Sequence, residues 1–221
     1  MQMVRSALLL ILLSAGVALA GCSEFTIPDA MVAKELSAFG MANTERHLRI
    51  STHLGVVEIE LYDDTPLHRG NILRLVKSGF YTSESCFYRV KENFMAQGGD
   101  PSRREPDFLV PAEFASGHFH RKGALAAARR DDNPGMASNP ADFYIVTGEG
   151  WDSASLADLG IGPTDPRYAV YLKEGGYPYL DGKYTVFGQV TKGIEVVEAI
   201  TRQRTREEKP LAPILFTIEA Y

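Results

Sequence analysis

The stretch of residues 87–100 constrains the fold more than any other part of the chain. It contains two runs rich in aromatic and apolar residues, Phe87–Val90 and Phe94–Gln97, with the polar segment 91–93 between them. Short runs of strand-forming residues that flank a polar turn are typical of a β-hairpin. The sequence therefore predicts two antiparallel strands here.

Four side chains of this hairpin are expected to converge on one surface. Successive side chains point to opposite faces of a strand, so Phe87 should share a face with Arg89, and Met95 with Gln97. Paired strands would then gather a guanidinium, an amide and two large apolar groups. Such a surface suits a ligand that is half apolar and half polar.

Composition places the chain among β-rich globular proteins. Its 221 residues are enough for one domain with a sizeable core. The 23 basic and 28 acidic residues are well mixed and give a net charge of −5, which offers no electrostatic footprint for nucleic acid. An aromatic content of 10%, with many glycines and turn residues, favours a folded β-rich domain over disorder.

The N-terminus has the pattern of an export signal. Met1–Arg5 carries one positive charge, Ala7–Ala18 is almost wholly apolar, and small residues follow. Because the apolar run is too short to span a membrane comfortably, residues 1–21 are interpreted as a cleaved signal peptide. The sequence Leu19–Cys22 resembles the lipobox of bacterial lipoproteins, which implies cleavage before Cys22 and its lipidation. The alternative is an ordinary signal peptide with an incidental cysteine.

Lipidation of Cys22 would anchor the protein, because two or three acyl chains hold a membrane durably. We therefore interpret residues 22–47 as a lipidated tether, with its best helical candidate at Ala30–Phe39. The expected location is the bacterial cell envelope, at the outer membrane and facing the periplasm. The only other cysteine, Cys86, is left without a partner, so no disulfide is expected in the mature chain.

Periodicity and turn residues predict the other elements. Apolar and acidic residues alternate in Val56–Tyr62, the pattern of a strand with one solvent-facing side. Pro66–Ser78 has an apolar stripe between a first-turn proline and a following glycine, which predicts a helix. The remaining expected elements are strands at Leu48–Thr52, Gly123–Ala128, Phe143–Thr147, Thr185–Val190 and Ile214–Ala220, and a short helix at Ile194–Thr201.

A series of sequence blocks runs in order from about Arg49 to the C-terminus. The blocks are Val76–Tyr81, Phe87–Val90, Asn93–Asp100, Gly123–Ala128, Phe143–Val146 and Leu180–Gly188. Together they resemble the cyclophilin-type peptidyl-prolyl cis-trans isomerases. The resemblance implies a mainly β fold for residues 48–221, a closed eight-stranded antiparallel barrel capped by two helices. It also implies an insertion near residues 149–178, in which Ser153–Leu156 and Pro166–Glu174 are expected to be helical.

The same resemblance implies an enzyme that accelerates rotation about X–Pro bonds without a cofactor or a metal. The X–Pro bond is an amide with a rotation barrier of about 18–20 kcal/mol, and it isomerises over tens of seconds or more. Stabilising the transition state by roughly 5 kcal/mol would shorten this to about ten milliseconds. A few pre-aimed hydrogen bonds in a dry groove can supply that amount.

By resemblance, Arg89 donates a hydrogen bond to the proline nitrogen as amide resonance is lost, and Gln97 orients Arg89. A guanidinium suits this role because it stays charged and does not give up its proton. The expected substrate-binding residues are Phe94, Met95, Ala128, Asp142, Tyr144, Leu180 and Tyr184. Taken alone, Arg89 would instead suggest a solvated strand residue, and the apolar side chains an ordinary core. Their occurrence together in the family's blocks favours the site.

Two features bear on these assignments. His118 and His120 would share a strand face, but no further ligands stand at a recognisable spacing, so no metal site is predicted. Asp142 stands where most family members carry glutamine, and a carboxylate there could pair with Arg89 and compete with the substrate carbonyl, which would favour a module with little turnover.

Two functions are therefore considered. The favoured one is an active isomerase that assists the folding of exported proteins by acting on proline-containing polypeptides. The alternative is a cyclophilin-like module that binds proline-containing segments with little turnover. A monomer is expected in either case.

Overall fold

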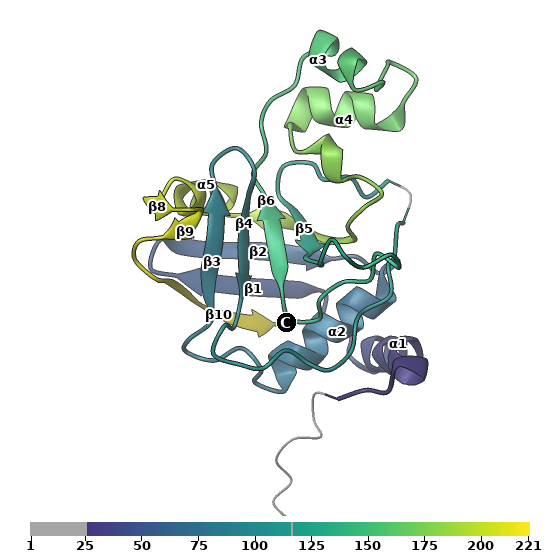
Figure 1. Ribbon diagram of the computed structural model, residues 1–221, viewed down its shortest axis with the longest axis vertical. Helices are drawn as coiled ribbons and strands as arrows, with labels where there is room; N and C mark the ends of the chain where they lie inside the picture. The colour runs from purple at the N-terminus through teal and green to yellow at the C-terminus, as the bar shows by residue number, and fades with distance from the viewer. Residues whose placement is uncertain (1–25, 116) are drawn as a thin grey trace, which may run out of the picture.

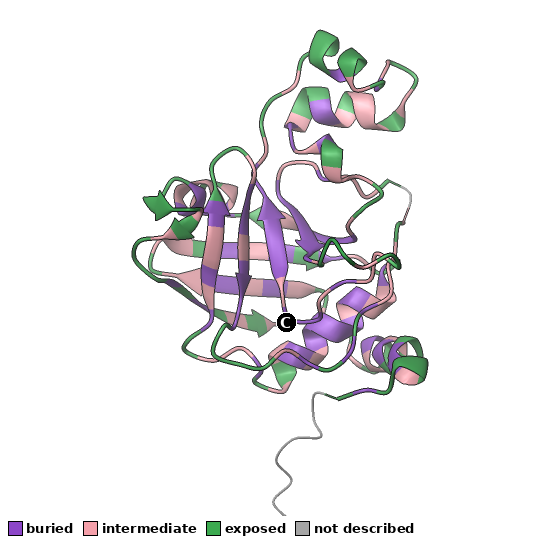
Figure 2. Ribbon diagram, viewed as in Figure 1, coloured by how far each residue is buried: buried purple, intermediate pink, exposed green. Residues whose placement is uncertain are grey.

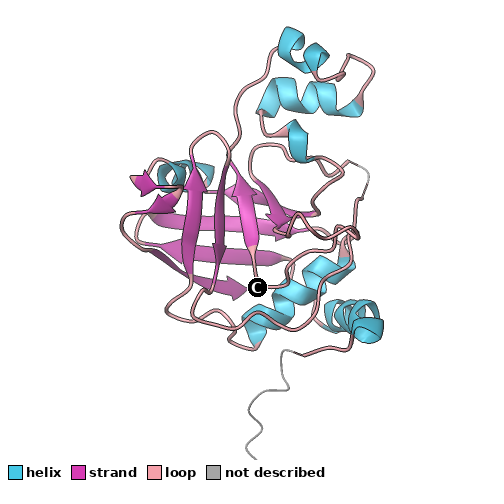
Figure 3. Ribbon diagram, viewed as in Figure 1, coloured by secondary structure: helices cyan, strands magenta, loops and turns pink. Residues whose placement is uncertain are grey.

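Antiparallel strands close into a barrel in the computed structural model, which describes residues 26–115 and 117–221 (Figures 1 and 3). Their order around the barrel is β1-β10-β3-β4-β6-β5-β7-β2. The strands are β1 (His47–Thr52), β2 (Gly55–Leu61), β3 (Cys86–Lys91), β4 (Met95–Gly99), β5 (Ala124–Ala127), β6 (Phe143–Val146), β7 (Val186–Lys192) and β10 (Ile214–Ala220). The predicted eight-stranded barrel is confirmed, and each strand lies within two residues of its expected bounds.

Two helices cap the barrel, as expected. They are α2 (Pro66–Lys77) and α5 (Ile194–Thr201), on opposite sides of the barrel in the view of Figure 1. Each buries one apolar stripe against the strands: Ile72 and Leu73 from α2, and Val197 and Ile200 from α5. Figure 2 shows the buried residues concentrated in the barrel strands and on the inner side of α2.

Aromatic rings fill the barrel next to β3 and β4. Phe87 lies 5.2 Å from Phe216 and 6.2 Å from Phe143 between ring centroids, and all three are almost fully buried. Burying one such side chain stabilises the fold by about 1.5–3 kcal/mol. Gly98 of β4 makes room for them, because a Cβ there would lie 3.1 Å from Phe216 and 3.2 Å from Phe87.

The hairpin of β3 and β4 differs from the predicted alternation. Phe87 pairs with Gly98 and Arg89 with Gln97, so Tyr88 has no partner of its own and forms a β-bulge. As a result Phe87 faces the barrel interior, whereas Arg89 faces outward. The expectation that these two side chains share a face is wrong, because simple alternation cannot reveal an extra residue.

The segment interpreted as a tether is in part folded. A short 3-10 turn, η1 (Asp29–Met31), leads into α1 (Val32–Ala42), which lies beside α2 (Figure 1). Ile27 and two residues of α1 are fully buried under the segment that carries Phe108. Residues from Ile27 onward therefore belong to the folded domain and do not extend away from it. Cys22 and the signal peptide lie outside the described residues.

The insertion carries the two predicted helices. They are α3 (Ser153–Asp158) and α4 (Pro166–Glu174), followed by the 3-10 turn η2 (Pro178–Leu180), and they project beyond one end of the barrel in Figure 1. Asp152 and Asp165 cap them by accepting hydrogen bonds from the backbone N–H groups of Ser155 and Arg167. Within residues 26–115 and 117–221, no helix is long and apolar enough to cross a membrane.

Close approach of α1 to α2 depends on Gly70. A Cβ at this position would collide with the backbone carbonyl of Leu36 in α1. We expect Gly70→Ala to lower the free energy of unfolding by about 1–3 kcal/mol, since overpacking forces the two helices apart. Urea unfolding of this variant beside Gly162→Ala, whose Cβ would meet open space, provides the measurement. Equal stabilities for the two variants would show that α1 does not need this contact.

Candidate active site

A cavity of about 330 Å³ lies on the outer face of the barrel, where β3, β4 and β6 run side by side. Eight of its ten lining residues are those predicted from the sequence: Arg89, Phe94, Met95, Gln97, Ala128, Tyr144, Leu180 and Tyr184. The other two, Arg129 and Asp131, lie in the loop that follows β5. Strand order explains this convergence, because residues far apart in the sequence occupy neighbouring strands. Their roles in catalysis stay predictions.

The floor of this groove is apolar. Met95 and Tyr144 are 2% and 5% exposed, and they pack with Ala126 and Val186 in a cluster separate from the barrel core. Gln97 lies directly opposite Tyr144 in the β4–β6 register, so the polar and apolar parts of the site adjoin. An apolar cavity beside a few fixed polar groups is suited to a small ring that carries an amide.

Hydrogen bonds hold the guanidinium of Arg89 at the edge of this floor. Its Nη1 donates to Oε1 of Gln97 at 3.2 Å, and its Nε donates to Oε2 of Glu208 at 2.7 Å. Gln97 is held in turn, because its Nε2 donates to the hydroxyl of Tyr88 at 2.7 Å. The hydrogen bond from Arg89 to Gln97 is the contact that an orienting role for Gln97 requires. The sequence analysis missed Glu208, which lies 119 positions from Arg89.

Asp142 is not where the sequence analysis expected it. It does not line the groove, and its carboxylate lies over Gly99, where it interacts with Tyr88 and Glu105. Burial and the Asp142 charge together raise the pKa of Tyr88 and also that of the Glu105 carboxyl. The pairing of Asp142 with Arg89 is therefore wrong, because Glu208 takes that place.

A buried polar network holds Tyr144 of the groove floor in place. Nε2 of His120 lies 3.0 Å from the Tyr144 hydroxyl, and its Nδ1 lies 3.0 Å from Oδ1 of Asp181. The hydroxyl of Tyr171 in α4 donates to Oδ2 of Asp181 at 2.7 Å, which ties the insertion to the groove. His118 lies outside this network, and its Nε2 is 2.7 Å from Oδ1 of Asp64. Neither histidine joins a cluster of three metal-ligating side chains in the described part of the chain.

This network makes stability depend on pH. Burial lowers the pKa of His120 below its usual 6.5, despite the opposing charge of Asp181, so the folded chain keeps this ring neutral. The unfolded chain binds a proton below about pH 6.5, and stability is therefore lost as the pH falls from there toward the folded pKa. We expect the melting temperature to drop over this range, and the slope to flatten in His120→Gln.

The control for this prediction is His53→Gln, at an exposed histidine in the turn between β1 and β2, and it should keep the slope of the unaltered protein. If the slope survives His120→Gln unchanged, other groups cause the acid sensitivity.

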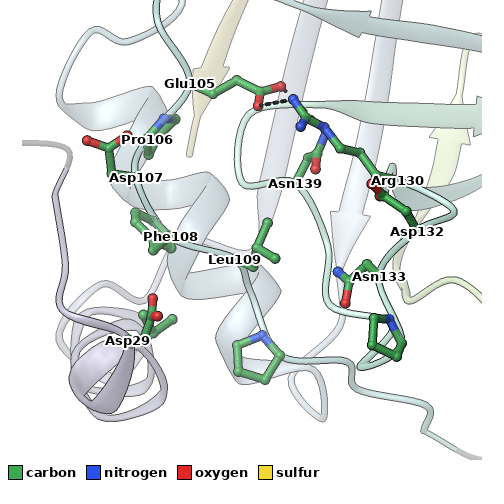
Figure 4. A pocket seen from close by; sticks show the side chains of 13 residues that line it. Asp29, Glu105, Pro106, Asp107, Phe108, Leu109, Arg130, Asp132, Asn133 and Asn139 are labelled. Carbon is green, nitrogen blue, oxygen red and sulfur yellow. Dashed lines mark hydrogen bonds and ion pairs between the residues drawn. The ribbon is translucent and has the colours of Figure 1, made fainter.

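A larger cavity of about 810 Å³ lies between the start of α1 and the loops near Glu105 and Asn133 (Figure 4). Its lining mixes four acidic residues with apolar ones such as Phe108 and Leu109, and Arg130 approaches Glu105 across it at 3.9 Å. None of the predicted site residues lines it, and among the described residues its Arg130 has no pair of anchoring side-chain hydrogen bonds like those of Arg89. The smaller groove is therefore the better candidate for the site.

Comparison with known proteins agrees with this geometry. Residues 47–219 match the sequence model of the family described as cyclophilin type peptidyl-prolyl cis-trans isomerase/CLD. The chain belongs to this family. It is 33% identical to a peptidyl-prolyl cis-trans isomerase homologue of Staphylococcus saprophyticus, over 77% of this chain and 88% of that one. It is also 29% identical to the peptidyl-prolyl cis-trans isomerase cypE of Dictyostelium discoideum, over 77% and 94%.

Solved structures show the same fold. A cyclophilin-type isomerase of Cryptosporidium parvum matches with a TM-score of 0.61 at 21% identity, covering 80% of this chain and 98% of that one. The same Cryptosporidium protein in the presence of the dipeptide Ala-Pro matches with a TM-score of 0.59. The cyclophilin barrel expected from the sequence is thus confirmed.

Proposed function

We propose that this cyclophilin-type isomerase acts on exported polypeptides while a lipid on Cys22 holds it at a membrane of the bacterial cell envelope. The observation that carries the enzymatic part is the fixed guanidinium of Arg89 beside the apolar floor of Met95 and Tyr144. The groove fits the two halves of an X–Pro unit, the ring on the floor and the amide at the polar edge.

Catalysis would consist of stabilising the twisted amide. The proline nitrogen regains its lone pair when the bond rotates out of resonance, and it then accepts a hydrogen bond that the planar amide cannot. Two nitrogens of Arg89 are occupied by Gln97 and Glu208, so its remaining N–H groups are available to the groove. Because the donor is pre-aimed, it costs no reorganisation when the amide twists.

The first test is the rate of isomerisation of a short X–Pro peptide. We expect Arg89→Ala to lower kcat/KM by about ten- to a hundredfold, equivalent to roughly 1.4–2.8 kcal/mol of lost transition-state stabilisation. The control is Arg46→Ala, at an exposed arginine paired with Asp63 and outside the groove lining. Equally low rates for the unaltered protein and Arg89→Ala would instead support a module that binds proline segments with little turnover.

The lipid anchor is supported by the signal-like segment and the small residues before Cys22. Because the folded domain already begins near Ile27, only residues 23–26 separate it from Cys22. Four residues span at most about 14 Å when fully extended. The isomerase would therefore work close to the membrane surface.

Fractionation of cells tests this location. We expect the full chain in the membrane fraction, and Cys22→Ala in the soluble fraction, because the variant cannot receive the acyl chains that anchor it. Cys86→Ala is the matched control, since it removes the other cysteine of the chain and should leave the protein on the membrane. Membrane association of Cys22→Ala would mean that another anchor exists.

A further inference from the structure

The carboxylate of Glu208 contacts the guanidinium of Arg89 from the side away from Gln97. Its Oε2 accepts from Nε of Arg89 at 2.7 Å, and its Oε1 lies 3.3 Å from Nζ of Lys91. Two positions of the guanidinium are thereby fixed, Nε by Glu208 and Nη1 by Gln97. In the described part of the chain Nη2 has no hydrogen-bond partner, and Arg89 lines the groove.

Glu208 reaches Arg89 from a tight hairpin outside the barrel. The hairpin pairs β8 (Thr205–Arg206) with β9 (Lys209–Pro210), leaving a two-residue loop of Glu207 and Glu208. Both loop residues have positive φ, 53° and 63°, which is the geometry of a type I′ turn. The loop is also joined to β3, because the N–H of Val90 donates to the carbonyl of Glu208 at 2.8 Å.

Glutamate is an unfavourable residue for such a turn. Positive φ brings Cβ close to the backbone, so type I′ turns strongly prefer Asn-Gly. Strained backbone persists where the surroundings enforce it, and it gathers at functional sites. Here the strain places a carboxylate on Arg89, which an Asn-Gly turn could not do. A hairpin that served only to connect α5 with β10 would not need it.

We infer that Glu208 is a positioning residue for the isomerase, which holds Arg89 with its free Nη edge toward the proline groove. The inference rests on the proposed role of Arg89. A guanidinium is planar, so anchoring Nε and Nη1 fixes the orientation of the whole group. Without Glu208, Arg89 keeps only its contact with Gln97 and samples other orientations.

The charges around Glu208 are consistent with this role. Burial opposes its ionisation, but hydrogen bonds and charges from Arg89 and Lys91 outweigh burial and lower the pKa of its carboxyl. Glu208 is thus ionised at neutral pH. Because Lys91 shares the carboxylate, the three side chains keep one net positive charge beside the groove.

The experiment compares kcat and KM of X–Pro peptide isomerisation for the full chain in detergent micelles. We expect Glu208→Ala to lower kcat about tenfold with KM nearly unchanged, since the Arg89 contact operates in the transition state. Glu208→Gln keeps an acceptor oxygen and should recover part of the loss. Glu207→Ala is the matched control, because Glu207 is exposed and sits in the same turn, and among the described residues no hydrogen bond or ion pair joins it to Arg89.

A second variant separates positioning from folding. The pair E207N/E208G supplies the preferred type I′ residues, so it should raise the melting temperature and yet lower kcat about tenfold. E207N alone keeps Glu208 and should retain the rate. If the hairpin had only a structural role, E207N/E208G would instead be as active as the unaltered protein.

The coupling to Arg89 is measured by a double-mutant cycle. R89A/E208A should be no slower than R89A, because Glu208 acts only through Arg89. The inference is overturned if Glu208→Ala is as fast as or faster than the unaltered protein, or if Glu207→Ala is equally slow. Should R89A itself keep the full rate, the proposed function fails. If R89A is slow and E208A is not, only this inference fails.

Discussion

The extra residue in β3 is the constraint on which both the core and the groove depend. Regular alternation would place Phe87 and Arg89 on one face. Either Phe87 would then leave the barrel core or Arg89 would leave the groove. The bulge at Tyr88 lets Phe87 fill the barrel while Arg89 faces the outer groove. Gly98 completes the arrangement, because any Cβ opposite the bulge would press on Phe87 and Phe216. Core packing and site geometry are therefore set by the same few residues.

The bulge also explains how the polar edge of the groove is connected. Tyr88 is turned toward Gln97 and Asp142, and Gln97 in turn meets Arg89, which meets Glu208. Tyr88 and Gln97 stand between Asp142 and Arg89 in this series of contacts, and the carboxylate that holds the guanidinium is that of Glu208. The carboxylate at position 142, which the sequence resemblance marks as a departure, is therefore not the one that pairs with Arg89.

Periodicity and turn residues were sufficient for most strands and helices, because these follow from local patterns, whereas the barrel and the groove residues were predicted from the resemblance of the sequence blocks to cyclophilins. Alternation in Val56–Tyr62 and the proline and glycine that bound α2 depend on neighbours in the chain. The contacts that were missed depend on distant partners. Nothing near Glu208 indicates Arg89, and nothing near Ile27 indicates that α1 packs on Gly70. A polar segment with a weak helical pattern resembles a tether until its partner surface is known.

The two walls of the groove are held by different physical means. Tyr144 is fixed by a nearly fully buried histidine and Asp181, in an environment that ions in solution screen little. The side chains of Arg89 and Glu208 are 43% and 33% exposed, so their attraction is weaker and is screened by salt. The apolar floor formed by Met95 and Tyr144 is therefore the more rigid part of the groove. The polar edge that carries Arg89 is more exposed, and the orientation of its guanidinium depends on Gln97 and Glu208 acting together rather than on the strength of either contact.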